Sequence, residues 1–204
     1  MVAGCVLVGA LAGYAASSAR HQAPTTTDLA EPLAAASPSV PTDPPVKTVP
    51  DSDEYGALGT VLSFVDKRIG APTDRWNYQV PRGWEPADQQ PGGIRWTLPG
   101  NPVFTYSMRV AIINTLPITT AQAARNRMVN VRTLLAYDQL ALTDDSLVFT
   151  YVLDQHARYQ HSHWLAEPGS GRTAFEITVS GRMRDRAGLD ALLEHLVATT
   201  RRVG

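Results

Sequence analysis

The chain of 204 residues contains a single cysteine, Cys5, and has almost no net charge. One cysteine cannot form an internal disulfide, and it excludes a zinc site built from several cysteines. The 18 basic and 19 acidic residues nearly balance, whereas a domain that binds nucleic acid normally carries a basic excess. We therefore expect no nucleic-acid partner, and a folded region whose stability comes from its core.

Motifs of nucleotide, metal and nucleophile sites are also missing. Neither GxGxxG, GxxxxGK[ST] nor HExxH occurs. Ser170 lies in PGSGR, but a nucleophile elbow needs G-x-S-x-G between a strand and a helix, and here a strand should follow. Asp144 and Asp145 in LTDDSL could serve acid-base chemistry, but adjacent aspartates are more typical of a turn. The sequence predicts no catalytic residue and no cofactor.

Charge is absent from residues 1–19, the most apolar part of the chain. About 20 apolar residues cross a bilayer as a helix, with a lower limit of about 17. This segment therefore predicts a single-pass membrane anchor. Two alternatives remain open: a cleaved signal peptide that ends near residues 16–19, and a lipoprotein signal in which VAGC, residues 2–5, presents Cys5 for lipidation.

Residues 20–53 contain seven prolines among Ala, Thr, Ser and Asp, without apolar periodicity. Such a stretch cannot bury enough surface to offset the entropy lost on ordering, so it predicts an extended, disordered linker. The folded domain is expected at residues 54–204. An anchor, a tether and a folded domain are the layout of a protein held at the cell membrane, with its domain on the extracytoplasmic side.

Apolar periodicity in the folded region predicts two helices and a series of strands. Residues 119–135 follow helical spacing and begin at a capping threonine. Residues 189–197 predict a second helix, with Arg201 and Arg202 near its C-terminal dipole. Strands are expected at residues 76–80, 93–97, 103–114, 146–153, 157–166 and 172–181, and the strand at 146–153 should be central because both of its faces are apolar.

An apolar run and a turn lie before the long strand at residues 103–114. Leu58, Val61, Leu62, Val65 and Ile69 fall at helical spacing, although two glycines leave a strand possible. Pro81 and Gly83 suit positions i+1 and i+3 of a type I turn. Short turns between successive strands imply antiparallel pairing, so the economical fold is α+β, an antiparallel sheet with helices packed on it.

Three histidines lie close together in the stretch around RYQHSHWL, residues 158–165. His161 and His163 are two apart, so on a strand they share one face and could supply two zinc ligands. A tight zinc site needs a third ligand. The spacing between His156 and His161 does not determine whether the His156 side chain can reach the same site. We predict that these histidines are not metal ligands.

The same face supplies part of the candidate binding surface. It comprises Trp84, Tyr159, His161 and His163. Trp84 follows the turn after a strand, and of the four tryptophans it is the one expected to be exposed. Large aromatic side chains mostly lie at least partly inside, so the opposing expectation is that all four belong to the core.

The order of these elements, with VPRGW (residues 80–84) leaving a strand, resembles the PsbP/Mog1-like fold over residues 75–203. In particular it is similar to extracytoplasmic domains of actinobacterial envelope proteins, namely the LpqN-type lipoproteins and the C-terminal domain of type VII secretion-associated proteins. The points of likeness include the long strand that ends at Asn114 and the closing helix after SGRMRD. The resemblance implies a non-catalytic accessory domain outside the cytoplasmic membrane.

These observations favour a non-enzymatic accessory protein that binds an envelope or secretion protein. One alternative is a carrier of a lipid or other small apolar ligand, which an apolar cavity lined by Phe104, Tyr106 and Met108 would favour. Another is a metal-dependent hydrolase that uses His161 and His163.

Overall fold

The computed structural model describes residues 46–102, 104–114 and 117–203. The predicted membrane segment at residues 1–19, its Cys5, and the linker up to residue 45 lie outside the described residues. The described part of the chain belongs to one compact unit. Within it, no helix has both the length and the apolar character needed to cross a membrane.

The strands form two antiparallel sheets. The larger has seven strands in the order β3-β4-β5-β9-β8-β7-β6, and the smaller has three in the order β1-β2-β10. The larger sheet comprises β3 (Glu85–Gln90), β4 (Gly93–Thr97), β5 (Tyr106–Ile112), β6 (Asp138–Leu142), β7 (Ser146–Leu153), β8 (His156–Ala166) and β9 (Thr173–Arg182). The smaller comprises β1 (Phe64–Ala71), β2 (Asp74–Pro81) and β10 (Arg201–Arg202).

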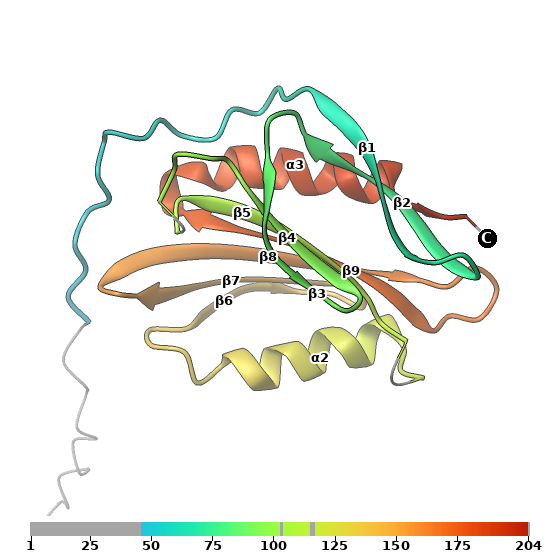
Figure 1. The fold of residues 1–204 in the computed structure, drawn as a ribbon. Coiled ribbons are helices and arrows are strands. Elements are labelled where there is room, and N and C mark those ends of the chain that lie inside the picture. The colour runs from blue at the N-terminus through green and yellow to red at the C-terminus, as the bar shows by residue number, and fades with distance from the viewer. Residues whose placement is uncertain (1–45, 103, 115–116, 204) are drawn as a thin grey trace, which may run out of the picture. The chain divides into compact units, whose positions relative to one another are not determined.

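Helices cover both faces of the seven-stranded sheet (Figure 1). Helix α3 (Arg186–Thr199) follows a single 3-10 turn and packs on β8, β9 and β2. Helix α2 (Thr120–Val131) packs on the opposite face, against β7 and β8. The predicted α+β class, with helices packed on an antiparallel sheet, is confirmed.

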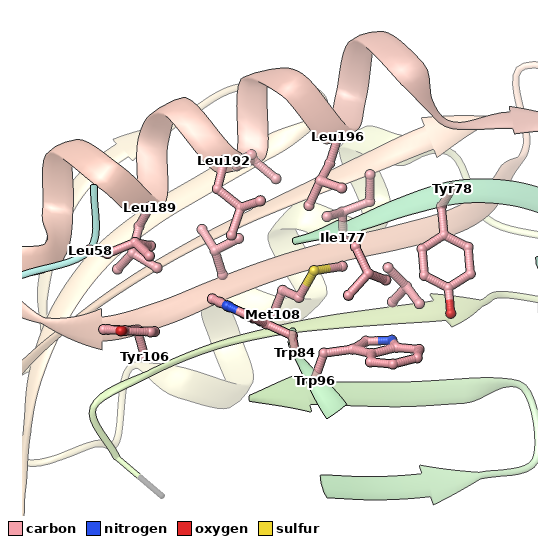
Figure 2. Packing of buried hydrophobic residues seen from close by; sticks show 14 of the residues in the cluster. Leu58, Tyr78, Trp84, Trp96, Tyr106, Met108, Ile177, Leu189, Leu192 and Leu196 are labelled. Carbon is pink, nitrogen blue, oxygen red and sulfur yellow. The ribbon is translucent and has the colours of Figure 1, made fainter. Parts of the chain in front are cut away.

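The main core lies between α3, the smaller sheet and one face of the larger sheet. Leu189, Leu192 and Leu196 point from α3 towards residues such as Met108 and Ile177 (Figure 2). All five side chains are at most 1% exposed. A smaller core on the other face joins α2 to β7 and β8 through Ala123, Ala124, Leu147, Phe149 and Trp164. The helical spacing of the leucines thus predicted correctly which face of α3 is buried.

The helix considered for residues 58–69 is wrong, and the strand alternative is correct. Residues 64–71 form β1, which pairs along its whole length with β2. Val61, one of the supposed helix contacts, is 92% exposed. The helical spacing of the apolar residues was coincidental, because the partner strand that fixes this conformation follows directly in the chain.

Helix α2 begins where the sequence predicts and ends earlier. Thr119 and Gln122 form a reciprocal capping box at its start. The helix stops at Val131 instead of continuing to Leu135, which is 57% exposed. Arg201 and Arg202 do not serve the end of α3, because they form the short strand β10 beside β2.

The edges of the seven-stranded sheet were not predicted. All side chains of β3 and most of β6 are exposed, so neither strand shows apolar alternation. Each carries a register shift against its neighbour, between Pro86 and Asp88 in β3 and between Gln139 and Ala141 in β6. Since β6 pairs with β7, the strand at residues 146–153 is next to the edge and is not central.

The turn after β2 lies one residue later than predicted. The amide of Trp84 donates to the carbonyl oxygen of Pro81 at 3.1 Å, so Pro81 is the first residue of the turn. Gly83 then occupies the third position with φ of 87°, a conformation that favours glycine.

Residues 49–58, which we call the N-terminal segment, are bound to the domain over their length. The amide of Val49 donates to Gln155, and that of Leu58 donates to the buried carboxylate of Asp185 at 3.0 Å. Arg182 donates to two backbone carbonyl oxygens of the segment, at 2.8 and 2.7 Å. Contacts with the fold therefore begin inside the range 20–53 that the sequence assigns to the linker.

Candidate functional site

The candidate binding surface predicted from the sequence lies mostly inside the protein. Trp84 is 7% exposed and stacks on Tyr106, with ring centroids 5.7 Å apart. Tyr159 is 1% exposed. The exposure expected for Trp84 is wrong, because the turn at Gly83 directs its ring back into the main core, and the other three tryptophans are buried too.

His161 and His163 share the face of β8 that α3 covers, as predicted for a strand. His156 lies on the opposite face by alternation, where its Nδ1 is 3.4 Å from Asp51. Among the described residues, no three His, Cys, Asp or Glu side chains converge as a metal site would require. Burial lowers the pKa of the half-buried His163 below its ordinary value.

His161 belongs to a hydrogen-bonded chain that joins three elements. Its Nδ1 lies 3.0 Å from Oδ1 of Asp190 in α3, and its Nε2 lies 2.9 Å from the hydroxyl oxygen of Ser146 in β7. Asp190 also accepts from the hydroxyl of Tyr159 at 2.5 Å. Burial, together with the hydrogen bond to Asp190, raises the pKa of Tyr159 well above its ordinary value. Tyr159 therefore stays protonated and donates.

A pocket on the other face of the sheet is lined by several basic side chains. It has a volume of about 240 Å³ and lies beside α2, in the part of the sheet that the helix leaves uncovered. We call it the arginine pocket, because four of its lining residues are Arg95, Arg109, Arg127 and Arg158. None of its lining residues, all within the described part of the chain, is acidic.

The sheet supplies a neutral, hydrogen-bonding floor for this pocket. Ser107 and Ser180 face each other across β5 and β9 with their hydroxyl oxygens 3.1 Å apart. Thr178 and Gln160 lie beside them. Hydroxyl and amide groups can donate to a bound anion without adding negative charge.

The four arginines differ in how their charge is balanced. Arg127 pairs with Glu176, and Arg158 pairs with Asp51 at 2.7 Å. Arg158 is only 7% exposed, and its Nε has no hydrogen-bond partner within the described residues. Arg109 is exposed, and none of the ion pairs among the described residues involves it. The pocket thus retains positive charge and free N–H donors.

A second pocket of about 330 Å³ adjoins the arginine pocket. The two share Phe104 and Arg158. The accessible surface of the second is chiefly apolar, although Asp51, Asp154 and Arg182 also line it beside Tyr55 and Pro102. Phe104 is 48% exposed, whereas Met108 is fully buried in the core. The cavity that would join Phe104, Tyr106 and Met108 is therefore not present in the described residues, although Phe104 and Tyr106 both line the arginine pocket.

Neither the four arginines nor the partners of His161 were predicted from the sequence. The four arginines come from β4, β5, α2 and β8, and only the strand register places Arg109 beside Thr178. Ser146 and Asp190 stand 15 and 29 residues from His161. One pattern in the sequence does indicate the pocket. Arg158, Gln160 and Ser162 alternate along β8, so one face of this strand carries polar side chains where a core would require apolar ones.

No family model matches the sequence, and no curated protein matches it. Two solved structures are similar in fold. One is LpqN of Mycobacterium tuberculosis, described as involved in cell envelope biogenesis, with 13% identity, a TM-score of 0.47, and coverage of 69% of this chain and 92% of that chain. The other is PA94 of Pseudomonas aeruginosa, a protein of unknown function described as a putative regulator, with 10% identity, a TM-score of 0.43, and coverage of 66% and 94%. Such distant likenesses assign no function.

Proposed function

We propose that the protein is a membrane-anchored, extracytoplasmic accessory protein that binds an anionic ligand in the arginine pocket. The observation that carries the proposal is the lining, with four arginines and no acidic residue over a floor of hydroxyl groups. Hydrogen bonds from guanidinium groups to carboxylate or phosphate oxygens are among the strongest in proteins. The anchoring rests on the charge-free residues 1–19 and the proline-rich stretch that follows.

The neighbouring pocket refines the chemistry of the ligand. It continues from Phe104 and Arg158 into mostly apolar surface. An amphiphile could place its anionic group among the arginines and its apolar part against Phe104 and Tyr55. This favours a carrier or sensor of an amphiphilic anion over a module that recognises only another protein.

Binding of decyl phosphate to residues 46–204 tests the proposal by calorimetry, with inorganic phosphate and decanol as comparisons. Decyl phosphate should bind more tightly than either. Arg109→Ala should weaken its binding about tenfold or more, because a hydrogen bond to a charged group contributes about 1.5–3 kcal/mol. The matched control is Arg125→Ala, which removes an exposed arginine of α2 that does not line the pocket.

Two outcomes would contradict the proposal. If decanol bound as tightly as decyl phosphate, the arginines would not select an anion. If Arg109→Ala and Arg125→Ala had equal effects, the attraction would be one of net charge and would not come from this pocket. Anchoring is tested separately by fractionation of the full chain, which should sediment with membranes.

A further inference from the structure

The hydrogen-bonded chain through His161 lies on the face of the sheet opposite the arginine pocket. Three groups stand in the order hydroxyl, imidazole, carboxylate: Ser146, His161 and Asp190. The two distances are 2.9 and 3.0 Å. An activated nucleophile requires a hydroxyl within hydrogen-bond reach of a base, and a third group that orients the base.

The surroundings fix the direction in which each proton points. Tyr159 keeps its proton and donates to Oδ1 of Asp190, so this carboxylate oxygen acts as an acceptor. Arg186 brings positive charge to within 3.7 Å of the other carboxylate oxygen. An ionised carboxylate only accepts hydrogen bonds, so Nδ1 of His161 must carry a hydrogen.

It follows that Nε2 of the neutral imidazole is the nitrogen with the free lone pair. In this neutral form the nitrogen faces the hydroxyl of Ser146, and that hydroxyl donates to it. The side chains of His161 and Asp190 are 23% and 40% exposed, and Ser146 is half-buried at the start of β7. The group is thus open to small molecules from solvent.

We propose that Ser146 is an activated nucleophile that accepts an acyl group from an activated carboxylic ester. The hydroxyl oxygen of Ser146 attacks the carbonyl carbon while its proton moves to Nε2 of His161. The bond between the carbonyl carbon and the leaving oxygen then breaks, and the departing oxygen leaves with the proton from His161 or as a free phenolate. The products are acyl-Ser146 and an alcohol or phenol. This site is independent of the proposed anion binding.

Exposure of the full chain to p-nitrophenyl acetate tests this assignment, with the acetylated residue located by peptide mass spectrometry. Ser146 should be acetylated much faster than Ser170, an exposed loop serine without a histidine partner that serves as a control in the same sample. Release of p-nitrophenolate should show a burst of about one equivalent. His161→Gln should slow acetylation by ~100-fold or more, the contribution of a general base.

Further variants separate activation from a merely structural role. Asp190→Asn should slow the reaction, whereas Ser170→Ala, in the exposed loop between β8 and β9, should leave the acetylation of Ser146 unchanged. The proposal is overturned if the wild-type protein acetylates Ser146 no faster than Ser170, a result that needs no folded variant. It is also overturned if a folded His161→Gln variant reacts at the wild-type rate.

Discussion

Replacement of Gly188 by alanine tests how tightly the N-terminal segment is seated on α3. A methyl group at this position would lie 2.3 Å from the carbonyl oxygen of Leu58 and 2.8 Å from its carbonyl carbon. Real Cβ atoms essentially never approach so closely, and the obstacle is backbone, which cannot rotate away as the end of a side chain can. The segment must therefore move.

Two opposing effects set the size of the change. Alanine is favoured over glycine within a helix by about 1 kcal/mol. Overpacking of a filled site costs about 1–3 kcal/mol. We expect Gly188→Ala to lower the free energy of unfolding by up to about 2 kcal/mol, which corresponds to a fall in Tm of up to roughly 8 °C for a domain of this size.

Calorimetry and hydrogen exchange together measure this effect. The amide of Leu58, which donates to Asp185, should lose protection in the variant. Gly56→Ala is the matched control, since a methyl group there meets nothing within 4 Å. If Gly188→Ala raised Tm while the Leu58 amide stayed protected, the close approach of the segment to α3 would be refuted.

Three other perturbations give distinct outcomes. Leu192→Ala should lower the free energy of unfolding by roughly 2–5 kcal/mol, because this side chain is 1% exposed in the main core; an unchanged thermal melt would show that α3 does not pack there. Asp51→Ala should cost about 1.5–3 kcal/mol by removing the partner of buried Arg158, while Asp53→Ala, whose carboxylate is 97% exposed, should have no measurable effect. Because burial lowers the pKa of His163 in the folded state, the unfolded chain binds more protons there below about pH 6.5, so the wild-type domain loses stability as the pH falls through that value. His163→Gln should reduce this loss in denaturant titrations, and an identical pH profile would contradict it.

The periodicity of apolar residues correctly predicted the elements in which buried side chains recur at regular intervals. The strand at Thr173–Arg182 and the leucines of α3 alternate or repeat as the core requires, and both were located correctly. β3 has six exposed residues and therefore no pattern to detect. The helix prediction for residues 58–69 was wrong for a different reason. The spacing of their apolar residues fits a helix, but pairing with β2 makes residues 64–71 a strand.

The residues of the two candidate sites could not be predicted from periodicity, because their proximity depends on the register between strands. His161 was noticed through its neighbour His163, yet its partners are Ser146 and Asp190, which no local motif links to it. The four arginines of the pocket likewise come from four different elements. A sequence shows which face a residue occupies on its own strand, but the neighbour across the sheet follows only from the pairing.

The shifted register at both edges of the seven-stranded sheet limits how this domain can associate. An unbroken edge is a template on which a strand of another chain can grow the sheet. Here β3 contains Pro86, which lacks an N–H donor, and both edge strands are interrupted by irregular pairing. Crowded copies of the domain should therefore resist edge-to-edge pairing of their seven-stranded sheets into fibres.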